Sequence, residues 1–216
     1  RMNNYVRKKS PTLSETNQIV ERLIPDANIR QARMIVDFLT KKQQSPEVQI
    51  ALLDALAQIG RKGKFSLGQR IGPLRKLIGN QNEEVASLAI ANLGAWQLKG
   101  AEKDLLSVLL DPKVPFASRK TAAVSLGQLR GGEGKKALLD LASKDKPTDR
   151  YFAIFGILET SAEEAAELAG GLFALDLGDL DPVALIQAFN RRSNGNTVLA
   201  KALDGKTIAP TVKDRV

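Results

Sequence analysis

The sequence predicts an all-α fold, a solenoid in which about six antiparallel helix pairs form a right-handed α-α superhelix. First, similar stretches recur at intervals of 31 to 37 residues around the anchors Leu56, Leu93, Leu126 and Ile157. Second, each stretch carries apolar residues at helical spacing, and a glycine-containing turn and a shorter amphipathic segment follow it. Third, the alternating β-branched pattern of strands is absent. Such a period is typical of stacked repeats rather than of one compact globule.

The repeated stretches also share a column of mostly small residues. The stretches are Val48–Leu56, Val85–Leu93, Ser118–Leu126 and Asp149–Ile157, and a weaker copy places Phe189 at the anchor position. The column, one residue before each anchor, holds Ala55, Asn92, Ser125 and Gly156. Small side chains let neighbouring helices approach closely, so we expect this column to lie at the repeat junctions.

Capping residues mark where the predicted helices begin. Thr12 and Glu15 have the spacing of a capping box. Ser45 and Asp181 each precede a proline, an arrangement that favours a helix start with a side-chain cap. Asn82 is the corresponding cap of the third pair, and two glutamates follow it in the first turn, where the helix dipole stabilises them.

These signals divide the chain into helix pairs that form one domain, residues 1–216. The predicted pairs span about 1–44, 45–80, 81–113, 114–145, 146–179 and 180–206. The sequence begins with Arg1 rather than methionine, and the segment Ala209–Thr211 is typical of the start of another helix. We therefore expect the chain to be a fragment of a longer protein.

Composition argues against several classes of site. The 216 residues include no cysteine and no histidine, which excludes disulfides, thiolate-bound metals and histidine-based catalytic triads within this segment. Three acidic residues, Asp176, Asp179 and Asp181, share a loop, but their spacing differs from that of a calcium-binding EF-hand loop, and Asp181 is a predicted cap. We expect no catalytic, cofactor-binding or metal-binding residues and therefore no enzyme activity.

Membrane insertion is not expected either. The longest apolar run, Phe152–Leu158, is far shorter than the roughly 20 residues that a helix needs to cross a bilayer. Absence of cysteine leaves the cellular compartment open.

The third repeat carries a family resemblance. Its sequence Asn82–Gly94, followed by a glycine turn and a helix rich in alanine and leucine, resembles a HEAT repeat of the short PBS-lyase-like kind. Ala122–Gly127 repeats the signature, whereas the motifs of tetratricopeptide and ankyrin repeats are missing. The resemblance implies an armadillo-like helical scaffold whose second helices line a concave, protein-binding face. The family name also raises a tetrapyrrole lyase as a hypothesis, which no set of residues supports.

A second resemblance concerns the C-terminal segment. Asn196–Val212 is similar to the HEAT region of large planctomycete-type haem-binding proteins, which join a dehydrogenase-like, membrane-bound assembly to a cytochrome with a Cys-x-x-Cys-His motif. This chain has neither cysteine nor histidine, so haem attachment would lie elsewhere in the parent protein. The resemblance implies a periplasmic or secreted location and electron transfer as an alternative function; without it, a cytoplasmic location is expected.

Charge suggests where a partner would bind. Residues 1–80 contain 15 basic and 6 acidic residues, net +9, while residues 81–216 contain 17 and 18, net −1. Exposed basic residues recur on the second helices of the first four pairs, and a basic concave face would hold an acidic partner. The candidate partner-binding residues are Arg30, Arg33, Arg75, Lys76, Lys103, Lys135 and Lys136, with Arg70 beside them.

Three functions remain open from the sequence. The first is a non-catalytic interaction or scaffold module that binds a protein partner or a neighbouring domain of the same protein. The second is a nucleic-acid-binding solenoid with a basic concave surface, for which the pI near 9.7 argues and the scarcity of aromatic residues argues against. The third is the haem-protein segment described above. The basic residues of the second helices also fit an ordinary solvated helix surface without a binding role, in which Asp37, Asp104 and Asp140 balance their charge.

Two short motifs bear on the same choice. The loop Gly60–Phe65 contains three basic residues and an aromatic one, a composition that suits an anionic partner but also an ordinary exposed turn. Gly131–Lys136 superficially resembles a phosphate-binding loop. It lacks the serine or threonine after the lysine and follows a helix rather than a strand, so we do not expect a nucleotide site.

Overall fold

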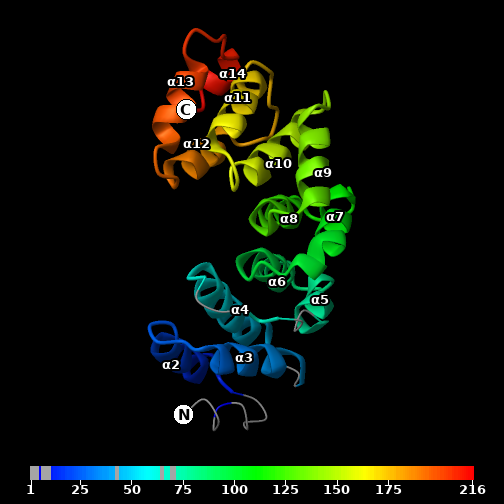
Figure 1. Cartoon of the computed structure of the whole chain (residues 1–216), viewed down its shortest axis with the longest axis vertical. Helices are drawn as coiled ribbons and strands as arrows, with labels where there is room; N and C mark the ends of the chain where they lie inside the picture. The colour runs from blue at the N-terminus through cyan, green and yellow to red at the C-terminus, as the bar shows by residue number, and fades with distance from the viewer. Residues whose placement is uncertain (1–4, 6–10, 42–43, 64–65, 69–71) are drawn as a thin grey trace. The chain divides into compact units, whose positions relative to one another are not determined.

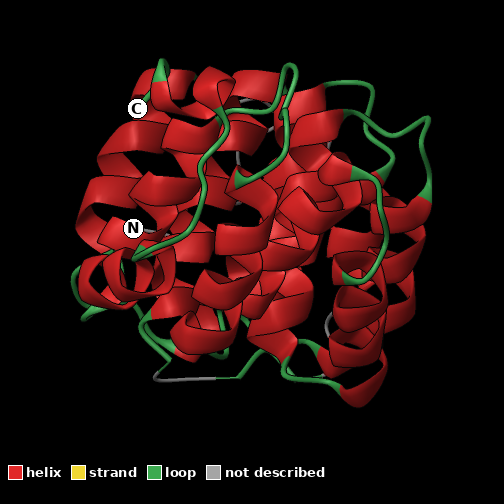
Figure 2. Ribbon diagram, turned by 90° about the horizontal axis from the view of Figure 1, so that it is seen from above, coloured by secondary structure: helices red, strands yellow, loops and turns green. Residues whose placement is uncertain are grey.

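The computed structural model describes residues 5, 11–41, 44–63, 66–68 and 72–216. All regular elements in these ranges are helices, and the described residues form no strand (Figure 2). The all-α prediction is therefore confirmed. None of the described helices combines the length and the apolar character that a membrane span requires.

The chain divides into two compact units, residues 1–125 and 126–216, with the boundary inside α8 (Phe116–Leu129). The first unit holds α2 (Leu13–Leu23), α3 (Ile29–Lys41), α4 (Pro46–Arg61), α5 (Gly72–Ile78), α6 (Glu83–Ala95), the 3-10 helix η1 (Lys99–Ala101) and α7 (Glu102–Leu110) (Figure 1). Within it, α4 packs against α2, α3 and α6, and α5 packs against α3 and α6.

The second unit holds α9 (Gly132–Ala142), α10 (Pro147–Ile157), α11 (Ala162–Phe173), α12 (Pro182–Asn190), α13 (Gly195–Leu203) and the short α14 (Pro210–Lys213). Here α10 packs against α9 and α11, and α13 packs against α11 and α12. In both units these packed helices belong to one predicted pair or to consecutive pairs, as stacked repeats require. The helix predicted after Ala209 is α14.

Most predicted caps form as expected, and one does not. Thr12 and Glu15 make both hydrogen bonds of the capping box, while Asn82 and Asp181 accept hydrogen bonds from the first turns of α6 and α12. Ser45 makes no side-chain cap, so that prediction is wrong. Its hydroxyl instead helps the backbone N–H of Glu47 to stabilise the Glu47 carboxylate, and together they lower the pKa of Glu47.

The predicted column of small residues is buried, and it sets the register between first helices. Asn92 Nδ2 on α6 donates to the Leu53 carbonyl on α4 at 2.8 Å, and Ser125 Oγ on α8 donates to the Ile90 carbonyl on α6 at 3.0 Å. In each case the acceptor lies two residues before the column position of the preceding helix, Ala55 or Asn92. The same contact therefore recurs at two successive junctions of the first unit.

In the second unit, α10 is buried along most of its length, from Tyr151 to its C-cap Leu158. Gly127 and Gly156 make a close approach: a Cβ on Gly127 would collide with the carbonyl oxygen of Gly156. Glycine at 127 is thus required by backbone proximity rather than by turn geometry.

Candidate partner-binding surface

The candidate basic residues of the first unit lie on amphipathic helices whose apolar faces are buried. On α3, Ala32, Ile35 and Val36 are buried, whereas Arg30 and Arg33 are exposed. Helical periodicity keeps charged side chains off the apolar face, so both arginines face solvent.

The next two second helices repeat this arrangement. Lys76 on α5 and Lys103 on α7 are exposed, and Leu74 and Leu105 of the same helices are buried. Neither lysine forms an ion pair with another described residue.

Arg75 differs from its neighbours because it joins two second helices. Its Nε donates to Asp104 Oδ2 at 2.6 Å, and its guanidinium also donates to the carbonyl of Gly100 just before α7. Asp104 is one of the acids that the sequence suggested as a balancing charge. The contact ties α5 to α7, so part of the charge of Arg75 is already neutralised within the fold.

The last two candidates lie in the second unit. Lys135 and Lys136 are adjacent and exposed on α9, but only Lys135 lines a cavity beside the start of that helix. Arg130, which the sequence analysis did not select, lines the same cavity and has a left-handed backbone with φ 52°. The sequence signal was its place before two consecutive glycines, where a tight turn is expected.

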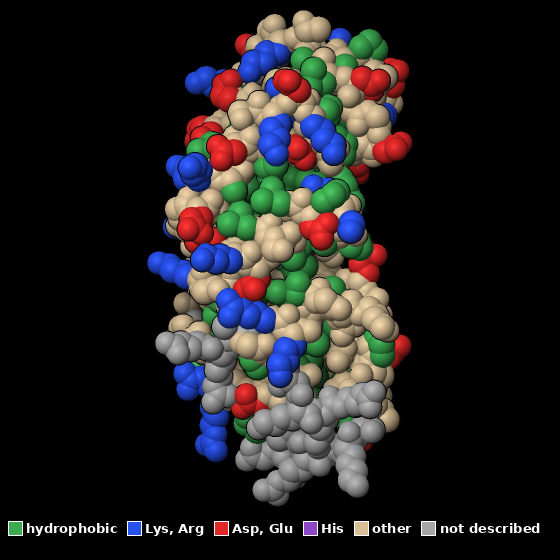
Figure 3. Space-filling view, turned by 90° about the vertical axis from the view of Figure 1, so that its right-hand side faces the viewer, with side chains coloured by type: hydrophobic (Ala, Val, Ile, Leu, Met, Phe, Trp, Pro, Cys, Tyr) green, Lys and Arg blue, Asp and Glu red, His purple; other side chains and the backbone are tan. Residues whose placement is uncertain are grey.

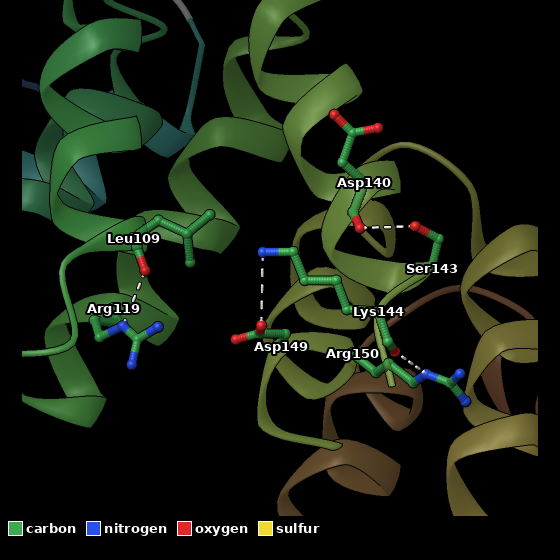
Figure 4. A network of polar contacts seen from close by, with 7 residues as sticks. All are labelled: Leu109, Arg119, Asp140, Ser143, Lys144, Asp149 and Arg150. Atoms are coloured by element: carbon green, nitrogen blue, oxygen red, sulfur yellow. Dashed lines mark hydrogen bonds and ion pairs between the residues drawn. The ribbon is translucent and has the colours of Figure 1, made fainter. Parts of the chain in front are cut away.

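Two arginines that occupy the same position in aligned repeats each make an equivalent contact, which the sequence analysis did not predict. Arg119 Nε on α8 donates to the carbonyl of Leu109 near the end of α7 at 2.9 Å, and Arg150 Nε on α10 donates to the carbonyl of Lys144 after α9 at 2.6 Å (Figure 4). Each therefore binds the carboxyl end of the preceding second helix, where a cation is favoured.

Further polar contacts surround the Arg150 contact. Lys144 Nζ lies 3.8 Å from Asp149 Oδ2, and Ser143 Oγ donates to the carbonyl of Asp140 at 2.8 Å (Figure 4). These basic residues close a turn between repeats. Part of the basic charge thus stabilises the fold and is not available to a partner.

Charges of both signs share the face drawn in Figure 3. In Figure 3, lysine and arginine side chains are dispersed among aspartate and glutamate rather than gathered into one continuous stripe. Dispersed charge is typical of a solvated protein surface, and it weakens the case for a long nucleic-acid-binding groove.

The acidic residues 176, 179 and 181 do not form a metal site in the described structure. Asp176 Oδ1 accepts hydrogen bonds from Gly178 N and from the hydroxyl of Thr211, and Asp181 caps α12. No group of three or more potential ligands that could hold a metal ion occurs among the described residues.

The remaining basic loop is only partly described. Lys64, Phe65 and Arg70 lie outside the described residues. Lys62 Nζ donates to the carbonyl of Ile24, so this lysine of the loop has a contact within the first unit.

No protein-family model matches the chain, and no curated protein gives a significant match to its sequence.

Proposed function

We propose that the chain is a HEAT-like, right-handed helical solenoid that acts as a non-catalytic scaffold. It binds a protein partner, or a neighbouring domain of the same protein, through the exposed surface of its second helices. The observation that carries the proposal is the repeated register between first helices, in which Asn92 and Ser125 make equivalent hydrogen bonds at successive junctions. Such repetition builds an extended surface from equivalent helices, as recognition solenoids do.

The two helices of a pair differ in which side chains they bury and which they expose, and this difference supports the same proposal. First helices carry the buried column of small residues, and one of them, α10, is buried from Tyr151 to its end. Second helices carry exposed cations, of which Lys76 and Lys103 have no ion-pair partner among the described residues. Side chains that stacking does not need are those that a partner can use, and their charge suits an acidic polypeptide.

A titration with two labelled polyanions tests this function. Poly-L-glutamate represents an acidic protein surface and duplex DNA represents nucleic acid, each measured by fluorescence polarisation at low and at physiological salt. We expect poly-L-glutamate to bind the wild type and Lys76→Glu/Lys103→Glu to bind it roughly tenfold more weakly, because two attractive contacts become repulsive. Arg75 is left in place, since its reversal would also break the contact with Asp104.

The matched control is Lys99→Glu/Lys113→Glu, which makes the same charge change at exposed positions of the first unit outside α5 and α7, in η1 and in the turn after α7. An equal loss of affinity for poly-L-glutamate in the control would show that only the net charge matters. It would contradict a binding surface on the second helices. Absence of binding to poly-L-glutamate would have the same consequence. Tighter binding to DNA with a steep salt dependence would replace the proposal with the nucleic-acid function, because counterion release dominates such binding.

A further inference from the structure

The second unit contains a cavity of about 240 Å³ that the scaffold proposal does not use. It lies where α8 ends, α9 begins and the turn after α10 leads into α11. Leu126, Leu138 and Ile157 form an apolar part of its wall, and each is almost completely buried. Arg130 and Lys135 add two exposed cationic side chains to the same wall.

Two glycines contribute backbone to the wall of this cavity. Gly127 and Gly131 both line the cavity, and neither places a side chain in it. Gly127 also permits the close backbone approach to Gly156 described above. The turn that follows is closed by a hydrogen bond from Arg130 N to the Gly127 carbonyl at 3.1 Å, which fixes Arg130 beside the opening.

The polar groups of the wall have a net positive charge. Against Arg130 and Lys135 stands one acid, Glu164, and these three side chains form no ion pair among the described residues. Thr160 Oγ1 donates to the carbonyl of Ile157 at 2.9 Å, so its oxygen keeps acceptor capacity. The helix dipole of α9, whose start has no side-chain cap, adds to the positive potential.

We propose that this cavity binds a small amphipathic carboxylate, with the apolar body against Leu126, Leu138 and Ile157 and the carboxylate between Arg130 and Lys135. Apolar walls with a few convergent polar groups are the usual composition of small-molecule sites. One net positive charge matches one carboxylate. A dry cavity of roughly 150 Å³ accommodates benzene, so this volume suits a body of roughly eight carbons.

The volume of the cavity argues against a nucleotide as the ligand. Drug-sized ligands occupy pockets of roughly 300–1,000 Å³, larger than this cavity. The segment Gly131–Lys136 also lacks the sequence pattern of a phosphate loop. The charge also argues against a neutral apolar ligand, which would leave the net positive charge of the wall unbalanced.

Three probes of one chain length test the proposal: octanoate, octan-1-ol and octylammonium, each titrated into the full chain labelled with ¹⁵N. We expect saturable amide shift changes at Gly131, Leu138 and Thr160. Octanoate should bind at least roughly tenfold more tightly than octan-1-ol, because a charged hydrogen bond contributes more than a neutral one. Octylammonium should bind most weakly.

Adjacent lysines on α9 provide a matched pair of variants. Lys135→Glu should weaken octanoate binding by roughly tenfold or more, and Lys135→Gln by less, because the first reverses the charge and the second removes it. Lys136→Glu makes the same charge change one residue away at a position that does not line the cavity, so its affinity should stay within about twofold of wild type. Preserved amide shifts far from the cavity show that each variant is folded.

Several outcomes would overturn the proposal. Equal affinities for octanoate and octan-1-ol would show that the cations do not contribute. Equal losses of octanoate affinity in Lys135→Glu and Lys136→Glu would show that only the net charge of the protein matters. Shift changes at Leu203 and Val212 would place the ligand in the separate, almost wholly apolar pocket beside α14, and the absence of saturable binding would remove the site altogether.

Discussion

The indole nitrogen of Trp96 donates a hydrogen bond of 2.9 Å to the carbonyl oxygen of Leu56. Trp96 is the C-cap of α6 and Leu56 lies in α4, so this bond joins consecutive first helices. The Trp96 side chain is only 5% exposed, so it packs at the junction between these two helices. Its ring lies against Gly60, which belongs to α4 and leaves room for the indole rather than ending the helix.

Gly60→Ala is therefore expected to destabilise the protein. A Cβ at this position would lie 2.8 Å from ring atoms of Trp96, closer than packed atoms tolerate, and the predicted loss is about 1–3 kcal/mol of unfolding free energy. Urea titration measures it. Gly171→Ala in α11 is the control, since open space surrounds Gly171 and alanine should stabilise that helix by about 0.5–1 kcal/mol. Equal stability of the two variants would contradict the tight Gly60–Trp96 contact.

Ser125 offers a test of the small column. Ser125→Leu should lower the free energy of unfolding by about 1–3 kcal/mol, because the position is 1% exposed and a larger side chain overpacks the junction with α6. Ser125→Ala should cost about 1 kcal/mol, from loss of the hydrogen bond to the Ile90 carbonyl. Urea titration again measures the free energy of unfolding, and Val124→Leu at the half-buried neighbouring position is the control. A Ser125→Leu variant as stable as wild type would mean that the column does not pack between helices.

Much of the helical fold could be predicted because its determinants are local in the sequence. The capping box at Thr12, the proline at 182 and the apolar spacing of Val48–Leu56 act within a few residues of one another. Burial of Asn92 and Ser125 also followed from the repeat, since an aligned column occupies equivalent environments. The Ser45 cap failed because the Ser45 hydroxyl interacts with the Glu47 carboxylate instead, whereas Asp181 before Pro182 does cap its helix.

The candidate surface was less predictable because its contacts cross between helices. That Arg75 reaches Asp104, 29 residues away, depends on how α5 and α7 lie together, and a list of charges does not contain that information. The cavity beside Lys135 is lined by residues from the end of α8, the start of α9 and the turn after α10, which only the packed structure brings together. Arg119 and Arg150, by contrast, share an aligned column, so a register-by-register comparison of basic residues would have identified them.

The arginine contacts at the repeat turns give the next prediction. Arg119→Gln and Arg150→Gln should each lower the free energy of unfolding by about 0.5–1.5 kcal/mol, because each removes a hydrogen bond to a carbonyl at the end of a second helix. Arg191→Gln is the control, because its side chain is exposed and forms no hydrogen bond or ion pair with another described residue. Urea titration at two salt concentrations separates the causes. An effect that disappears in high salt would assign the stabilisation to surface charge instead of the hydrogen bonds.

Tyr151 predicts how stability depends on alkaline pH. Burial, with the charge of Asp181 as a second cause, raises the pKa of Tyr151 to about 12 from its ordinary value of 10.0, and its hydroxyl donates to the Asp181 carbonyl at 2.9 Å. The unfolded chain therefore releases this proton at a lower pH than the folded chain. The contribution of Tyr151 to the free energy of unfolding is complete below pH 10 and is lost as the pH rises from 10 towards 12.

The variant Tyr151→Phe tests this dependence because phenylalanine cannot ionise. We expect its unfolding free energy to be lower than that of wild type at pH 8, where the hydrogen bond is lost, and the difference to shrink above pH 10. Denaturant titrations between pH 8 and 11.5 measure this difference, which also cancels the ionisation of lysines and of Tyr5 common to both proteins. A difference that stays constant across this range would show that Tyr151 ionises equally easily in the folded and unfolded chains.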